Sequence, residues 1–202
     1  MSGSGTMTNG NLHCVSVEEF VSWMDAHHET ASEVWIALPK KGTPVPSLTR
    51  DEALDVALCF GWIDGKAYSG NVPEGWWAQR FSPRTRRSPW SKINCAKVEK
   101  LIAAGRMRPP GFAQIEQARS DGRWDAAYAP QSTAEVPPDL RAALDASPAA
   151  AAAYEALSRS NRYQILLNVE KAVKPETRAR RIAVYVDRLA AGDPPNGPRK
   201  RP

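Results

Sequence analysis

Residues 57–84 read ALCFGWIDGKAYSGNVPEGWWAQRFSPR, and this stretch decides the fold. Its apolar start is typical of a buried helix end, which Gly61 is well placed to terminate. Residues 62–70 and 76–84 then have the composition of two short strands. Because a loop rich in Gly, Pro and Asn joins them, we expect the two strands to lie side by side in one sheet.

The residues before this stretch add a third strand. The segment EVWIALPKK at 33–41 alternates apolar and polar side chains, which predicts a strand. Together the three strands would form a small sheet that is at least partly antiparallel.

Two helices are expected to accompany this sheet. Ser16 with Glu19, and Thr49 with Glu52, are capping boxes. They predict helices over 17–28 and 50–60.

The residues after the stretch predict helices only. Start signals and apolar stripes indicate helices near 92–104 and 109–120, and four more follow up to residue 192. We therefore expect an α+β N-terminal half and an all-helical C-terminal half, with no more than four strands, all before residue 90.

The expected domain organisation follows from these elements. Residues 1–15 are polar and rich in Gly, Ser and Thr, which predicts a flexible N-terminus. Residues 16–108 would form the α+β core, and 109–192 a helical region that packs on it. Residues 193–202 are expected to be a disordered tail.

Composition excludes several classes of protein. Of the 202 residues, 42% are hydrophobic and 24% are charged, which is typical of globular chains and not of disordered ones. No apolar run approaches the roughly 20 residues of a membrane helix. The N-terminus lacks the apolar segment of a signal peptide, so we expect a cytoplasmic protein with three free thiols.

Positive charge is concentrated in one segment. The net charge is +5, yet residues 80–108 hold nine basic residues against one acidic residue, whereas residues 1–79 hold four against ten. Such a concentration points to a local anion site.

Trp62 and Asp64 are the first candidates for a site. Two residues apart on a strand, their side chains share one face of the sheet. In a structural interpretation Trp62 packs in the core and Asp64 pairs with Arg84 across two neighbouring strands. In a functional interpretation the aromatic ring and the carboxylate line a cleft.

The basic loop supplies the other main candidates. FSPRTRRSPW at 81–90 combines arginines with hydroxyl groups and a tryptophan. Guanidinium groups bind phosphate or carboxylate in a bidentate fork, and a tryptophan can stack on a ring. The alternative is a solvated loop. The candidate ligand-binding residues, including a lysine at a strand end and an asparagine in a first helical turn, are Lys41, Trp62, Asp64, Arg84, Arg86, Ser88, Trp90 and Asn94.

Long motifs give the chain a family resemblance. ALCFGWIDG at 57–65, RFSPRTRRSPWSKIN at 80–94 and ETRARRI at 176–182 occur together with Lys40-Lys41 and with GRW at 122–124. Across about residues 16–192 the chain is similar to the bacteriocin-protection or OmpD-associated (YdeI-like) family of bacterial proteins. The resemblance implies a role in stress or antimicrobial-peptide protection, with no assigned reaction. Some descriptions of the family imply a periplasmic location.

Three functions compete on this evidence. The first is a non-enzymatic protection protein that binds an anionic small molecule or phosphate through residues 80–94. The second is an enzyme for a small phosphorylated or carboxylated substrate, although no catalytic residue can be assigned. The third is nucleic-acid binding, which the acidic first 79 residues disfavour. No cofactor or metal motif occurs, and the sequence sets no oligomeric state.

Overall fold

The computed structural model describes residues 5–8, 10–172 and 174–193, which form two compact units. Of the described residues, the first unit comprises 5–8, 10–90 and 94–126, and the second comprises 91–93, 127–172 and 174–193. The boundary between the two units thus lies after residue 126, further along the chain than the boundary expected at residue 108. The last residues of the predicted tail, 194–202, lie outside the described part of the chain.

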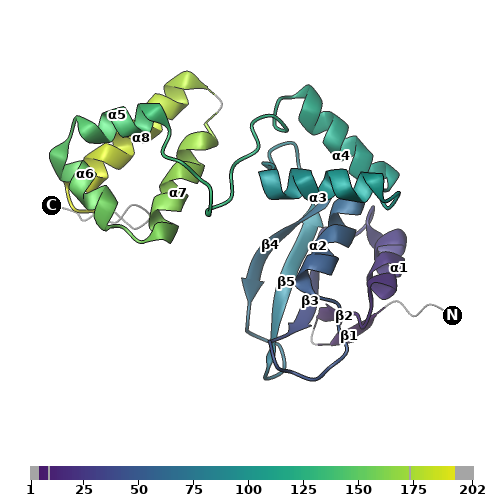
Figure 1. Cartoon of the computed structure of the whole chain (residues 1–202). Coiled ribbons are helices and arrows are strands. Elements are labelled where there is room, and N and C mark those ends of the chain that lie inside the picture. Colours follow the sequence, from purple (N-terminus) through teal and green to yellow (C-terminus); the bar gives the residue numbers. More distant parts are fainter. Residues whose placement is uncertain (1–4, 9, 173, 194–202) are drawn as a thin grey trace. The chain divides into compact units, whose positions relative to one another are not determined.

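A mixed five-stranded sheet forms the centre of the first unit (Figure 1). The spatial order is β1-β2-β3-β5-β4, and only β2 and β3 pair in parallel. The strands are β1 (Thr6–Thr8), β2 (Asn11–His13), β3 (Val34–Pro39), β4 (Trp62–Tyr68) and β5 (Trp76–Pro83).

The predicted count of three strands, with four as the upper limit, is wrong. The sequence predicts β3, β4 and β5, but β1 and β2 fall in the segment that was expected to be flexible. Each is three residues long, too short to show an alternating pattern. Their strand structure depends on backbone pairing with each other and on the contact of Leu12 with Ile36, so it arises from the sheet and not from local preference.

One face of the sheet carries the core of the first unit. The register pairs Val34 with Phe81 and Ile36 with Gln79, so these side chains share a face. The ring of Phe20 from α1 (Val17–His27) lies 6.0 Å from the ring of Phe81. Figure 1 shows α1 and α2 (Arg50–Cys59) on the same side of the sheet.

The predicted helix starts of α1 and α2 are confirmed. The Ser16 hydroxyl accepts a hydrogen bond from the backbone of Glu19, and Thr49 and Glu52 form both bonds of a capping box. Each bond satisfies an amide that the first helical turn would leave without a partner.

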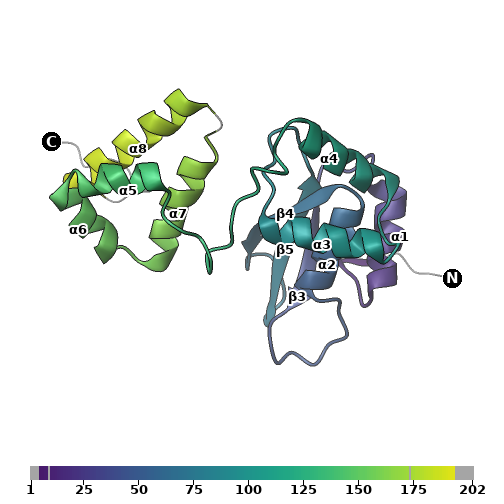
Figure 2. The same ribbon diagram turned by 45° about the horizontal axis from the view of Figure 1, so that its top comes forward.

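Two further helices complete the first unit beyond the end of the sheet at which β4 begins (Figures 1 and 2). They are α3 (Lys92–Ala103) and α4 (Pro109–Ser120). Gly111 allows α4 to approach the end of α2, because a Cβ atom at this position would lie 2.3 Å from the Cys59 carbonyl oxygen. This close approach explains why α4 belongs to the first unit.

Four helices form the second unit around a core of their own. They are α5 (Pro138–Asp145), α6 (Pro148–Ala156), α7 (Arg159–Glu170) and α8 (Pro175–Ala190). Leu140, Leu144 and Ile165 are fully buried at the centre of this core. No helix in the described part of the chain has both the length and the apolar character needed to span a membrane.

Candidate functional site

Asp64 pairs with Arg50 and not with Arg84. Arg50 is the first residue of α2, and its guanidinium donates a hydrogen bond to the Asp64 carboxylate. The pair is partly hydrated, with 45% of the Arg50 side chain and 21% of the Asp64 side chain exposed. The expected bond between the carboxylate and Arg84 is therefore wrong, because α2 brings a different arginine to the same face of β4.

Trp62 is a core residue. Its side chain is buried, and its ring meets the ring of Trp23 edge-on at 6.2 Å. The predicted shared face of Trp62 and Asp64 fits these contacts, since α1 covers the tryptophan and α2 the carboxylate. With the ring buried and the carboxylate bound to Arg50, the two residues do not line an open cleft.

Arg84 is buried directly after β5, with only 5% of the residue exposed. Its guanidinium carbon lies 3.6 Å from the centre of the Trp90 ring, and Nη1 donates a hydrogen bond of 3.2 Å to the Pro89 carbonyl. A guanidinium packed on an aromatic face is attracted by the quadrupole of the ring, whose face has a negative electrostatic potential. Arg84 therefore holds the loop together and is not presented to a ligand from solvent.

Trp90 is also buried, with 2% of the residue exposed. The Trp124 ring lies 5.0 Å from it, and the guanidinium of Arg119 lies 4.9 Å from the Trp124 ring. Two neighbouring rings, Trp90 and Trp124, thus lie between the cations of Arg84 and Arg119, and we call these four residues the Arg–Trp stack. Stacking of Trp90 on a ligand, as the sequence suggested, does not fit this packing.

Hydrogen bonds order the rest of the basic loop, which we define as residues 84–90. The Ser88 hydroxyl accepts a bond of 3.0 Å from the amide of Thr85, which closes a tight turn. Arg123 donates a bond of 3.0 Å to the Ser88 carbonyl and binds the Asp121 carboxylate. The predicted candidate Ser88 is therefore a turn residue.

Arg86 and Arg87 remain exposed at the turn of the basic loop. Within the described residues, neither guanidinium forms an ion pair. The hydrogen bond from Arg123 lowers the pKa of Asp121, and the positive charge of Arg86 adds to the same effect. Arg86 is thus near Asp121 but is free to bind another anion.

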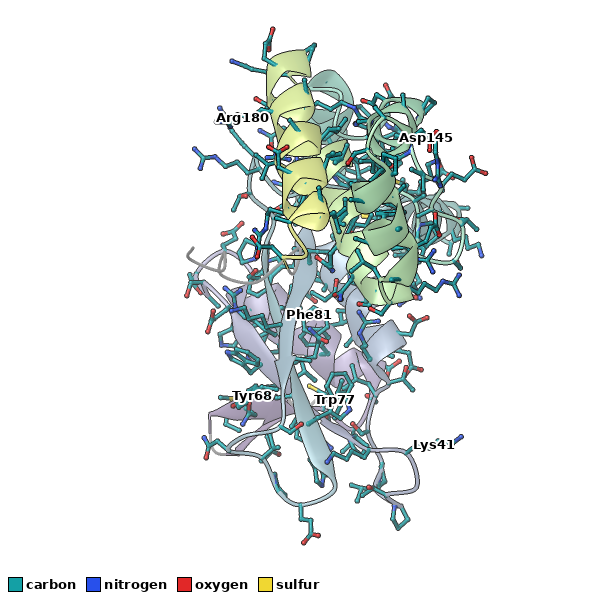
Figure 3. The ribbon with its side chains drawn as sticks, turned by 90° about the vertical axis from the view of Figure 1, so that its left-hand side faces the viewer. Lys41, Tyr68, Trp77, Phe81, Asp145 and Arg180 are labelled. Atoms are coloured by element: carbon teal, nitrogen blue, oxygen red, sulfur yellow. The ribbon has the colours of Figure 1, made fainter. Side chains whose placement is uncertain are left out.

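The last two candidates do not join this site. Asn94 is buried in the first turn of α3. Lys41 follows β3 at the end of the sheet where β5 begins, whereas Arg84 follows the last residue of β5 (Figure 3). At about 3.3 Å per residue the eight residues of β5 separate them by roughly 25 Å.

The residues that complete the site come from a region that sequence reasoning did not assign to it. Arg119, Asp121, Arg123 and Trp124 lie more than 25 residues after the basic loop. The GRW motif at 122–124 is a signal for two of them, Arg123 and Trp124. In the described part of the chain, no group of three or more His, Cys, Asp or Glu side chains is arranged to hold a metal ion.

Two family models match this chain. A domain of unknown function (DUF8412) matches residues 12–114, which is more than half of the chain. A second model, described as bacteriocin-protection, YdeI or OmpD-associated, matches residues 133–192 and includes the ETRARRI motif. No curated protein and no solved structure matches the chain significantly. The chain therefore belongs to the DUF8412 family through residues 12–114, and its residues 133–192 are similar to the bacteriocin-protection, YdeI or OmpD-associated family.

Proposed function

We propose that this protein is a binding protein that takes up an anionic group, phosphate or carboxylate, at Arg86 and Arg87 of the basic loop. The observation that supports the proposal is the contrast within the loop. Arg84 is buried against Trp90, while Arg86 and Arg87 are exposed and form no ion pair within the described residues. Adjacent guanidinium groups suit the planar, bidentate recognition of phosphate and carboxylate.

The order of the loop favours binding. The turn from Thr85 to Ser88 and the Arg–Trp stack fix the backbone that carries both arginines. A loop that is already ordered loses less conformational entropy when a ligand binds. The two exposed guanidinium groups are therefore carried by a backbone that is ordered before an anion binds.

The geometry favours this role over the alternative enzyme. That enzyme needs a cleft lined by Trp62, Asp64, Arg84 and Trp90. Three of these residues are buried, and the fourth is bound to Arg50. These four residues therefore do not bring an acid and a base together in one open space.

Stabilisation by inorganic phosphate tests the proposal. Phosphate at about 100 times its dissociation constant would stabilise the native state by roughly 2.7 kcal/mol. The double variant Arg86→Ala/Arg87→Ala should lose this stabilisation, and Arg86→Lys/Arg87→Lys should keep part of it. Arg180→Ala is the matched control, because its side chain extends outward from α8 (Figure 3).

The measurement is the melting temperature as a function of phosphate concentration at constant ionic strength. An equal phosphate-dependent rise in the wild type and the double alanine variant would contradict the proposal. So would the absence of any rise in the wild type.

A further inference from the structure

A second basic feature of the first unit is a pocket of about 250 Å³ between α1, the end of α2 and the loop from α3 to α4. It is independent of the basic loop. Its lining combines apolar side chains with two arginines, namely Val17, Val21, Val56, Phe60, Arg106 and Arg108.

The floor of the pocket is apolar because two helices present matching faces. Val17 and Val21 are four residues apart on α1, and Val56 and Phe60 have the same spacing at the end of α2. Residues with this spacing lie above one another on one side of a helix. Such a floor is suited to the apolar body of a small molecule.

The loop after α3 places the two arginines at this floor. Gly105 has a φ of +67°, which lets the chain turn sharply, and the amide of Arg106 bonds to the Leu101 carbonyl at 3.0 Å. The Arg108 amide then bonds to the Cys59 carbonyl at 3.2 Å. Met107 between the two arginines is buried, so its side chain anchors the loop.

Both guanidinium groups are without an ion-pair partner in the part of the chain that the structure describes. Arg106 and Arg108 are also exposed. The guanidinium of Arg108 lies 5.9 Å from the Phe60 ring, so its charge is next to the apolar floor. A ligand that complements this site carries a negative group beside a compact apolar body.

We propose that this pocket binds a small carboxylate with an aromatic or branched aliphatic body. The carboxylate would bind Arg106 and Arg108, and the body would cover the valines and Phe60. A volume of about 250 Å³ is just below the ~300–1,000 Å³ range of pockets for drug-sized ligands, which favours a molecule of the size of benzoate. Inorganic phosphate could use the arginines but would leave the apolar floor hydrated.

Titration with benzoate tests the site. Binding is measured by calorimetry, and its location by the methyl NMR signals of Val17, Val21 and Val56. Benzoate should bind saturably and shift these methyl signals. Acetate, which lacks the body, and benzyl alcohol, which lacks the charge, should each bind more weakly.

Single variants of the two arginines test the charged part of the site. Arg106→Gln and Arg108→Gln should each weaken benzoate binding by about tenfold or more, since each removes a charge-assisted bond. Both residues are exposed, and unchanged circular dichroism and melting temperature would show that the variants fold. Arg180→Ala, which removes an exposed arginine of α8 outside both proposed sites, is the matched control and should bind benzoate like the wild type.

Three outcomes would overturn the proposal. They are no saturable benzoate binding by the wild type at millimolar concentration, benzoate binding by both glutamine variants that is as tight as that of the wild type, and methyl shifts that do not include the three valines. Complete loss of benzoate binding in the Arg86→Ala/Arg87→Ala variant, with the valine methyl signals unmoved, would place the carboxylate at the basic loop and would likewise contradict the pocket. Failure of the phosphate experiment leaves these results unaffected, because the two sites share no residue.

Discussion

At the scale of single residues, burial separates arginines that look alike in the sequence. Arg84, Arg86 and Arg87 occur within four positions of one another. The first is packed on Trp90 with 5% of its surface exposed, while the other two are open to solvent. Their side chains should therefore affect different properties, stability for Arg84 and ligand binding for its neighbours.

Trp90 should be a major determinant of stability. Trp90→Ala removes a buried ring that contacts both Arg84 and Trp124, so we expect a loss of about 3–5 kcal/mol in the free energy of unfolding. Denaturant unfolding measures this loss. Phe112→Ala is the control, because Phe112 is an exposed aromatic residue of α4. A loss of less than about 1 kcal/mol for Trp90→Ala, the scale of a surface change, would show that the Arg–Trp stack contributes little.

Asp64 should contribute much less than Trp90 to the free energy of unfolding. The Asp64–Arg50 pair is partly hydrated, and exposed ion pairs contribute about 0–1 kcal/mol. Asp64→Asn keeps the volume and removes the charge, so the denaturation midpoint should change by less than the equivalent of about 1 kcal/mol. A loss near the roughly 3–5 kcal/mol of a broken buried pair would contradict this assignment.

At the scale of elements, the sequence predicted features that neighbouring residues determine, such as helix starts. It did not predict contacts between residues that are far apart in the chain. The capping residues Ser16 and Thr49 identified the starts of α1 and α2, because a cap acts over three residues. The packing of Trp90 on Trp124 could not be predicted, since it joins residues 34 positions apart in the chain. The ion-pair partner of Asp64 could not be predicted either. The sequence contains several arginines, and the packing of α2 determines that Arg50 is the one that binds the carboxylate.

The contact between α2 and α4 should tolerate no side chain at Gly111. A Cβ atom there would lie 2.3 Å from the Cys59 carbonyl oxygen, so one of the helices must shift. We expect Gly111→Ala to lower the free energy of unfolding by about 1–3 kcal/mol, as is typical of overpacking. Thermal or denaturant unfolding is the measurement. Ala113→Ser on the exposed side of α4 is the control, and equal stability of the two variants would contradict the close contact.

The ion pair between α5 and α8 makes the second unit sensitive to acid. Arg178 binds both oxygens of Asp139, at 2.5 and 2.8 Å, and these hydrogen bonds lower the pKa of Asp139 from its usual 3.8. A carboxyl whose pKa is lower in the folded state stabilises the protein above the unfolded pKa. This stabilisation is lost as the pH falls through the folded value.

Acid unfolding of an Asp139→Asn variant measures the contribution of this pair. Because 46% of the Asp139 side chain is exposed, we expect less than about 1 kcal/mol at neutral pH. The stability difference between the wild type and the variant should shrink below pH 3.8. A difference that is constant from neutral to strongly acidic pH would refute the role of the ion pair.

At the scale of the whole molecule, we expect full burial of Cys14 and Cys59 and partial burial of Cys95 to make all three thiols slow to react. Desolvation raises the pKa of Cys14 to about 12 and that of Cys95 to about 11, and it also raises the pKa of Cys59. The thiolate is the reactive form, so little of it exists near neutral pH. The native protein should therefore react slowly with a disulfide reagent at mildly alkaline pH.

Reaction with such a reagent, followed by absorbance, gives the number and rate of accessible thiols. Guanidinium-unfolded protein is the control and should release three equivalents rapidly. Fast reaction of Cys14 in the native protein would show that the N-terminal strands do not cover it. A thiol count below three after unfolding would contradict the expectation of free cysteines.

The N-terminal hairpin has a consequence for aggregation. A strand at the edge of a sheet exposes backbone groups that can pair with another molecule. β1 and β2 cover the side of β3 that would otherwise be such an edge, and β3 is rich in apolar residues. At the opposite edge, β4 is interrupted by a bulge between Asp64 and Ala67, where Lys66 is exposed. A short strand on one side and a bulge with a lysine on the other both oppose edge-to-edge association, so the hairpin helps to keep separate molecules apart.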